Sequence, residues 1–193
     1  MSFYSNEELL AAGFSSVGDN VRISNKVSLY GISGTIGHHV RIDDFCILKG
    51  RIVLENYIHV GSFCLLTGVC GEVYLQDGSV LSSGVHVYTG SDDYRADVLS
   101  SGAVPQELVK TIKGDVRLGK GSIVGAQSLL LPNTYIEDGA SIGAHCVVYG
   151  RVPAGAVMVS GTGKAKKTKQ RDYKKIVNLV EQLTGNSKQT KSM

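Results

Sequence analysis

The sequence predicts an all-β solenoid, a fold in which the chain winds around one long axis. An aliphatic residue recurs at every sixth position over about 130 residues, and the residue four places further on is again small or aliphatic. A period of six fits neither the 3.6-residue turn of a helix nor the two-residue alternation of a strand. It fits short flat strands joined by tight corners, with one such unit in each repeat. The aliphatic positions are Val17, Ile23, Leu29, Ile36, Ile42, Leu48, Leu54, Val60, Leu66, Leu75, Leu81, Val87, Leu118, Val124, Leu130, Ile136, Ile142 and Val148.

The composition agrees with a narrow solenoid. The chain has 193 residues, of which 24 are glycine and four are phenylalanine, and it has no tryptophan. Aliphatic and small side chains suffice to fill such an interior, and glycine reaches the backbone angles of tight corners. The eighteen repeats, taken three to a coil, predict about six triangular coils. We therefore expect one solenoid domain over residues 17–160.

The four cysteines share one position in the repeat. Cys46, Cys64, Cys70 and Cys146 all fall at the inward position four places after an aliphatic residue. We interpret them as small core residues that remain free thiols, and neither as disulfide partners nor as metal ligands.

Both ends of the chain carry helical signals. Residues 1–16 contain a short predicted helix, in which Ser5 and Glu8 form a capping box and Gly13 marks the end. Residues 161–193 are predicted to form a basic turn, a helix from about Thr168 to Thr184 with one apolar stripe, and a disordered polar tail from Gly185 to Met193. Both helices are expected to cover the solenoid, since its terminal coils need caps.

One long interruption breaks the six-residue period. Residues 89–115 lack it and contain the polar run Gly90–Arg95. In a strict solenoid such a segment must loop outward, and long loops on rigid scaffolds commonly carry function. This excursion loop is the first place to look for an active site.

Charge and hydropathy exclude several classes of protein. The formal net charge is +3, and the positive excess lies near the C-terminal end, so no basic face is available for nucleic acid. No run of about 18 apolar residues and no signal sequence occur, which predicts a cytoplasmic protein without a membrane span.

Three repeats carry a resemblance to a known family. The stretches Ile36–Arg41, Val124–Leu129 and Ile142–Val147 follow the hexapeptide pattern of an aliphatic residue, a glycine, two free positions, a further residue that is small in two of the three, and one free position. The chain resembles the hexapeptide-repeat acyltransferases over about residues 17–160. The resemblance implies a left-handed parallel β-helix.

A narrower resemblance is to the acetyltransferases of bacterial surface-polysaccharide biosynthesis. It is carried by Val40–Cys46, Asn56–Val60 and Ser91–Tyr94. It implies a homotrimer with active sites between subunits, acetyl-coenzyme A as cosubstrate and a sugar as acceptor. The family also contains zinc enzymes with two histidines five residues apart, a spacing that is missing here. We therefore expect no metal.

The excursion loop departs from the family pattern, in which a histidine at its start acts as the base. Here Asp92 and Asp93 stand at that place, so we expect Asp93 or Asp92 to be the base, assisted by His59. Three equal faces would put His59 and Asp92 at different corners of one prism, so that they could meet only across a subunit boundary. His86, which shares the corner phase of Asp92, is a second candidate. We expect Tyr94, His86 and Arg95 to contact the sugar.

The later coils match the coenzyme-binding part of the family. Gly125, Ala126, Gly143 and Ala144 occupy the positions that bind the pantetheine arm in relatives. Relatives also have a Gly-x-Pro-Ala-Lys turn near the coenzyme phosphates. The corresponding basic run here lacks the proline, and Lys164, Lys166 and Lys167 are its candidate phosphate ligands.

Two functions from different classes remain open. The first is an acetyl-coenzyme A-dependent sugar acetyltransferase, with N-acetylation of a nucleotide-linked amino sugar slightly preferred over O-acetylation of a polysaccharide. A neutral amine loses its proton only after attack, so a weak base is enough. The second is a non-catalytic scaffold, favoured by the missing histidine and proline but not by the long loop with two acids and a tyrosine.

Overall fold

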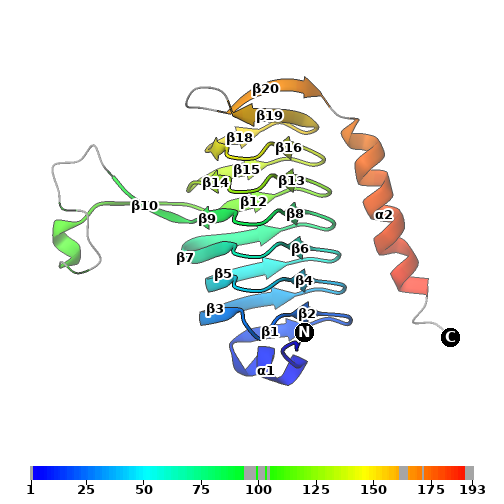
Figure 1. Ribbon diagram of the computed structural model, residues 1–193, viewed down its shortest axis with the longest axis horizontal. Helices are drawn as coiled ribbons and strands as arrows, with labels where there is room; N and C mark the ends of the chain where they lie inside the picture. Colours follow the sequence, from blue (N-terminus) through cyan, green and yellow to red (C-terminus); the bar gives the residue numbers. More distant parts are fainter. Residues whose placement is uncertain are drawn as a thin grey trace.

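The structure is a computed structural model that describes residues 2–93, 99, 103, 105–160, 165–170 and 172–189, with backbone only at 165–168 and 186–189. The described residues form a parallel β-solenoid of about seven turns, with a short helix at one end and a long helix along one side (Figure 1). The prediction of an all-β solenoid with a C-terminal helix is confirmed.

One sheet forms a single face of the solenoid and runs nearly its whole length. Its strands pair in parallel except for the last, which is antiparallel to its neighbour. In sheet order they are β2 (Arg22–Ile23), β4 (Arg41–Ile42), β6 (His59–Val60), β8 (Val80–Leu81), β13 (Ile123–Val124), β16 (Ser141–Ile142), β19 (Ala156–Ser160) and β20 (Ala165–Gln170).

The second sheet forms the other two faces, because its three longest strands bend from one face to the next. Its strands are β1 (Phe14–Val17), β3 (Ser28–Ile36), β5 (Ile47–Leu54), β7 (Leu65–Leu75), β9 (His86–Tyr88), β12 (Val116–Leu118), β14 (Leu129–Leu130), β15 (Thr134–Ile136), β17 (Val147–Val148) and β18 (Arg151–Val152). The remaining elements are α1 (Asn6–Ala11), β10 (Gly90–Asp92), the 3-10 helix η1 (Gln106–Leu108), β11 (Thr111–Lys113) and α2 (Tyr173–Gln189).

Three corners separate the faces, and each recurs once per turn. Corner A comprises residues 18–21, 37–40, 55–58, 76–79, 119–122, 137–140 and 153–155. Corner B comprises residues 24–27, 43–46, 61–64, 82–85, 125–128 and 143–146. Corner C comprises residues 31–32, 50, 69–71, 89–115, 131–133 and 149–150, so the excursion loop leaves the solenoid from corner C of the fourth turn.

The aliphatic positions fill the interior, as the six-residue period predicts. All eighteen except Val17 and Leu29 are buried. These two are partly buried and lie in the first turn, which packs against a second turn on one side and against the N-terminal segment on the other. Helix α1 closes this end: its Ser5 hydroxyl accepts a hydrogen bond from the Glu8 amide at 3.2 Å, the Glu8 carboxylate accepts one from the Ser5 amide at 2.7 Å, and Leu9 is fully buried.

Helix α2 packs along corner A, where glycine permits a close approach. Turns four to six place Gly78, Gly121 and Gly139 at one left-handed position of this corner. A Cβ on these glycines would lie 2.9 Å from Val180, 2.5 Å from Ile176 and 2.8 Å from Tyr173, respectively. The first three turns carry Asn20, His39 and Tyr57 at the same position, with φ between 56° and 58°. The glycines therefore determine where the helix can pack against the solenoid.

The C-terminal region differs from the prediction in three respects. The solenoid has about seven turns instead of six, because β18 follows β17 after the two-residue corner Tyr149–Gly150, which breaks the six-residue period. The basic segment 165–170 is the strand β20 rather than a turn, and it covers the open edge of β19. Helix α2 accordingly begins at Tyr173, not near Thr168, and it continues through Gly185–Gln189, which were expected to be disordered.

Cys70 also departs from its predicted place. Cys46, Cys64 and Cys146 are buried, but Cys70 is only partly buried. In the β5–β7 pair, Gly50 aligns with Gly68 and Ile52 with Val73, so residues 69–72 stand opposite Arg51 alone. These extra residues move Cys70 out of the inward phase, and it lies at the root of the excursion loop instead of in the core.

Candidate active site

A cleft of about 560 Å³ opens at corner C, where the excursion loop leaves the solenoid. Its floor is made by apolar side chains of neighbouring turns and its wall by the start of the loop. The lining residues are Lys49, Thr67, Val69, Cys70, Tyr88, Thr89, Gly90, Ser91, Asp92, Thr111, Leu129 and Leu131.

Thr89 fixes the start of the excursion loop. Its side chain is buried, its hydroxyl donates to the Thr67 carbonyl at 2.7 Å and accepts a hydrogen bond from the Cys70 amide at 3.1 Å. At Gly90, a Cβ would lie 2.7 Å from the sulfur of Cys70, so only glycine fits beside this thiol. The chain then leaves and returns as the antiparallel ribbon β10–β11, in which Asp92 pairs with Thr111.

Asp93, one of the two predicted bases, is held at the end of this ribbon. Its side chain is 9% exposed, a carboxylate oxygen lies 3.2 Å from Nζ of Lys110, and its backbone amide donates to the Lys110 carbonyl at 2.8 Å. Asp92, the other candidate, is partly buried and lines the cleft. A carboxylate that is nearly buried and held in one place beside the cleft can accept a proton from a substrate there.

His59, predicted to assist the base, lies on a different part of the solenoid. It belongs to β6, and its Nε2 is 2.9 Å from Oδ2 of Asp43, whose Oδ1 accepts a hydrogen bond from Arg41 at 2.7 Å. Burial alone would raise the pKa of the Asp43 carboxyl. The hydrogen bonds and positive charge of His59 and Arg41 outweigh burial, so the pKa lies below its ordinary value of 3.8. His59 does not line the cleft.

The three predicted sugar contacts are placed only in part. His86 lies in β9 with an exposed side chain, in register with Leu65 and Leu129, and its ring meets the edge of Tyr88. It is therefore on the outer surface beside the cleft. Tyr94 and Arg95 lie outside the described residues.

The residues predicted to bind the pantetheine arm lie together on corner B. Gly125 and Ala126 belong to the fifth turn, Gly143 and Ala144 to the sixth. A Cβ on Gly125 would lie 2.5 Å from the Ala144 amide nitrogen, so successive turns are packed as closely as the backbone permits. The coenzyme would contact backbone atoms here.

The described part of the basic run, in β20, lies next to the end of the same corner. Val159 of β19 contacts Gly143, and Val159 pairs with Lys166, while Met158 pairs with Lys167. The side chains of Lys166 and Lys167 are not described, and Lys164 lies outside the described residues. The backbone of β20 nevertheless brings this run to the end of corner B next to Gly143.

Within one chain the predicted base and the predicted coenzyme residues are on different corners. Asp92 and Asp93 leave from corner C, whereas Gly125 and Gly143 lie on corner B, and the face that contains β9, β14 and β17 separates them. His59 lies in β6, on the face between corners A and B, so it is also away from Asp92 within one chain.

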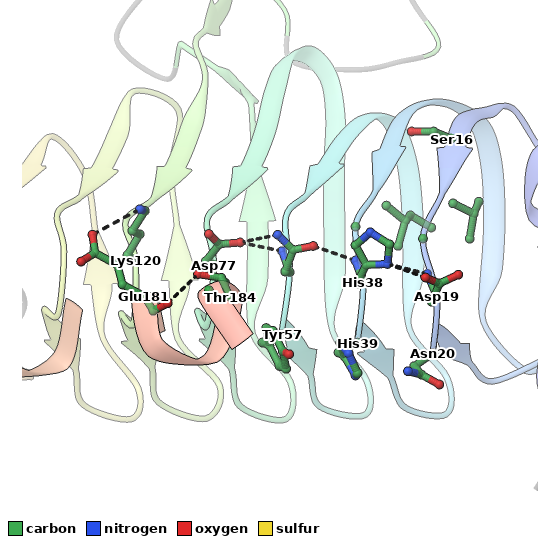
Figure 2. A pocket seen from close by; sticks show the side chains of 16 residues that line it. Ser16, Asp19, Asn20, His38, His39, Tyr57, Asp77, Lys120, Glu181 and Thr184 are labelled. Atoms are coloured by element: carbon green, nitrogen blue, oxygen red, sulfur yellow. Dashed lines mark hydrogen bonds and ion pairs between the residues drawn. The ribbon is translucent and has the colours of Figure 1, made fainter. Parts of the chain in front are cut away.

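A larger groove of about 1320 Å³ lies at corner A, between α2 and the first turns (Figure 2). Its polar side chains mainly link successive turns: the Asp19 amide donates to Nδ1 of His38 at 2.8 Å, and the His38 amide donates to Asn56 at 2.9 Å. His39 stacks on Tyr57 with ring centroids 4.5 Å apart. The excursion loop extends from the opposite side of the solenoid (Figure 1). We therefore assign the candidate active site to the smaller cleft at corner C.

Comparisons with known proteins identify the family. No protein-family model matches the chain. A dTDP-4-amino-4,6-dideoxy-D-glucose acyltransferase of Escherichia coli is 38% identical over 152 residues, which cover 77% of this chain and 79% of the relative. The chain belongs to the sugar N-acyltransferases of the left-handed β-helix type.

Solved structures of AntD, an N-acyltransferase from Bacillus cereus, are also similar to this sugar N-acyltransferase. The AntD complex with dTDP and 3-hydroxybutyryl-CoA is 37% identical, with a TM-score of 0.86 and coverage of 97% of this chain and 98% of AntD. A single-residue AntD variant bound to dTDP-4-amino-4,6-dideoxyglucose and coenzyme A is 37% identical, with a TM-score of 0.83 and coverage of 95% and 98%.

The predicted family, and with it the predicted enzyme class, is confirmed. The preference for an amino-sugar acceptor agrees with the relatives, and nothing in the comparisons supports a non-catalytic scaffold. Within the described part of the chain, no helix is long and apolar enough to cross a membrane, and no group of three or more potential metal ligands occurs.

Sequence reasoning missed three residues of the cleft region, namely Cys70, Thr89 and Lys110. The signal for Cys70 was present, since Leu66 and Leu75 are nine positions apart instead of six and the insertion falls at the corner of the excursion loop. Lys110 had no such signal, because its pairing with Asp93 depends on the register of the ribbon β10–β11.

Proposed function

We propose that this protein transfers an acyl group from acyl-coenzyme A to the amino group of a dTDP-linked 4-amino-4,6-dideoxyhexose. The observation that carries the proposal is the similarity over most of the chain to the E. coli enzyme and to AntD, whose substrate or bound ligands are of this kind. Acetyl-coenzyme A is the donor we expect, and 3-hydroxybutyryl-CoA is the alternative that AntD suggests.

The proposed reaction needs one proton acceptor. The amine nitrogen attacks the thioester carbonyl carbon, the C–S bond breaks, and an amide and coenzyme A form. The nitrogen gives up a proton, which passes to the carboxylate of Asp93, or to that of Asp92, and leaves with the thiol. Asp93 suits this role because it is nearly buried, yet it stands next to an open cleft. His59 is the weaker candidate because Asp43 already occupies its Nε2.

The proposed site is composite and lies between the subunits of a cyclic homotrimer. A rotation axis parallel to the solenoid axis keeps each turn at its own height, so corner C of the fourth turn can face corner B of a neighbour at the same level. This arrangement would bring Asp93 of one copy to the coenzyme residues Gly125 and Gly143 of the next copy. Acyl-coenzyme A and dTDP-sugars are cytoplasmic metabolites, which supports a cytoplasmic location, and the product would enter surface-polysaccharide synthesis.

The test is a direct assay of the purified protein. It is mixed with dTDP-4-amino-4,6-dideoxyglucose and either acetyl-CoA or 3-hydroxybutyryl-CoA, and thiol release and product mass are followed. We expect thiol release that depends on the amino sugar and a product heavier by one acyl group. Failure to acylate the amino sugar with either donor would refute the proposal. The mass of the assembly in solution tests the trimer separately.

A further inference from the structure

The excursion loop joins the solenoid at a narrow root, and the proposed base lies some way along the ribbon that starts there. β10 and β11 form a two-stranded sheet of their own. The pairing continues to Asp93, whose amide donates to the Lys110 carbonyl at 2.8 Å. A ribbon of two strands has little stability of its own, so contacts at its root are needed to set the direction in which it leaves the solenoid (Figure 1).

Thr89 makes contacts in two directions at this root. Its side chain is fully buried, and its amide and its hydroxyl both donate to the Thr67 carbonyl, at 3.1 and 2.7 Å. The hydroxyl also accepts a hydrogen bond from the Cys70 amide at 3.1 Å. The carbonyl of Thr89 accepts one from the Gly114 amide at 3.0 Å, where the loop returns. Thr89 thus ties the outgoing end of the loop both to the third turn and to the returning end.

The hydroxyl of Thr89 adds a link that the backbone alone does not make. It joins two groups of the third turn, the carbonyl of Thr67 and the amide of Cys70, which lie three residues apart at the start of corner C. Removal of the hydroxyl would take the acceptor from the Cys70 amide and leave the backbone bonds of Thr89 in place. The hydroxyl can therefore be removed on its own, and the root of the loop would then be held less firmly.

The distance from the root to the base makes a small change of direction large. Asp93 follows Thr89 by four residues, and extended residues advance about 3.4 Å each, so their backbones are about 13 Å apart along the ribbon. A rotation of about 5° at Thr89 would move Asp93 by about 1 Å over this length. A misplacement of that size can lower the rate of a reaction between positioned groups by about 100-fold.

We propose that Thr89 is a positioning residue for the reaction, whose buried hydroxyl holds the ribbon β10–β11 at the angle that brings the Asp93 carboxylate to the acceptor amine. The proposal rests on the function proposed above. The same ribbon carries Asp92, the other candidate base. Thr89 acts through these acids and not on the substrate, because its side chain is fully buried and its hydroxyl bonds to the backbone of the third turn.

The experiment compares Thr89→Val with the wild-type protein in the thiol-release assay. Valine has nearly the shape of threonine but lacks the hydroxyl, so kcat should fall by about tenfold or more. kcat/KM for the amino sugar should fall by the same factor, because a displaced base weakens the transition state and not the bound substrate. Thr89→Ser keeps the hydroxyl and should recover most of the lost rate. In an Asp93→Asn background, Thr89→Val should lower kcat no further, since the base that it positions is already lost.

Thr134→Val is the matched control. Thr134 is an equally buried threonine that follows corner C of the next turn, where the corner has only three residues. Its hydroxyl donates to the carbonyls of Leu131 and Val148, at 2.6 and 3.1 Å. Both valine variants lose a buried hydroxyl and should unfold at similar urea concentrations, but Thr134→Val should keep the wild-type kcat.

Three outcomes would overturn the positioning role. They are wild-type kcat in Thr89→Val, an equal loss of kcat in Thr134→Val, and an additive loss in the Asp93→Asn background. If Thr89→Val does not fold, Thr89→Cys supplies a weaker hydrogen-bonding group, and its kcat should lie below that of Thr89→Ser; equal values would count against the role in the same way. Inactive wild-type protein would refute the proposed function, whereas the other outcomes leave that function standing, so the two failures are distinguishable.

Discussion

The ammonium group of Lys110 lies 3.2 Å from a carboxylate oxygen of Asp93, and the Lys110 carbonyl accepts a hydrogen bond from the Asp93 amide. The two contacts join the outgoing and returning segments of the excursion loop next to Thr111 of β11. They hold a carboxylate that is almost buried at the edge of an open cleft. A group that is restrained in this way keeps its position while substrates enter, as the proposed base must.

Replacing Asp93 with asparagine should separate chemistry from binding. Asn keeps the shape of the side chain but cannot take a proton, so kcat should fall by about 100-fold or more. The KM of acyl-coenzyme A should not change, since Asn keeps the shape of the side chain and the proposed base takes its proton from the acceptor amine. Steady-state thiol release measures both quantities, and Asp92→Asn is the matched neighbour. Wild-type kcat in Asp93→Asn would remove this residue from the reaction.

Cys70 should be the cysteine that reacts first in the folded protein. It lines the cleft, whereas Cys46, Cys64 and Cys146 are buried in the core. Brief treatment with iodoacetamide should label Cys70 and inactivate the enzyme, because the added group fills part of a 560 Å³ cleft. Peptide mass spectrometry locates the label. Cys70→Ser should stay active and resist the reagent, and labelling of a core cysteine at an equal rate would contradict the assigned exposure.

Acid should weaken the protein partly through Asp43. The pKa of Asp43 is lower in the folded protein than its ordinary value of 3.8, because the hydrogen bonds and charges of His59 and Arg41 outweigh the opposing effect of burial. The resulting stabilisation is complete above pH 3.8 and is lost as the pH falls through the lower, folded-state pKa. Asp43→Asn should cost about 1 kcal/mol at pH 7, and this difference should shrink below pH 3.8. Urea unfolding at several pH values measures it, and a difference that grows in acid would reverse the sign.

Helix α2 should depend on one buried contact with corner A. Val180 is 5% exposed and packs on Gly78, whereas its neighbour Leu179 is 52% exposed. Val180→Asp should weaken docking of the helix by about 2 kcal/mol or more, so amide exchange in α2 should accelerate roughly 30-fold. Leu179→Asp carries the same new charge and should leave exchange unchanged. Equal exchange in both variants would mean that the helix is not held at this contact.

Most of the fold was predictable because an aliphatic residue marks the same inward position in each repeat. The period was strong enough to place the core from Ile23 to Val148 and the corner from which the excursion loop leaves. It failed where the corner length changes. The two-residue corner before Arg151 hid the last turn, and the insertion after Gly68 displaced Cys70. The lysine-rich sequence of β20 does not predict a strand, because this strand depends on pairing with the edge of β19.

The candidate site was predictable only where it coincides with the broken period. Asp92 and Asp93 were identifiable as acids at the start of the loop, and the structure places Asp92 in the wall of the cleft. The pairing of Asp93 with Lys110, and that of His59 with Asp43, depend on which strands lie side by side, and no local pattern encodes this.

Because every turn bonds only to the turns above and below it, the length of this molecule can change in whole coils. Duplicating the coil that carries Phe45 would add about 4.8 Å below the fourth turn and leave everything above it in place. Deletion of that coil would shorten the same end by the same step. The protein thus has a modular end and a constant end, and its length can change at the former without altering the latter.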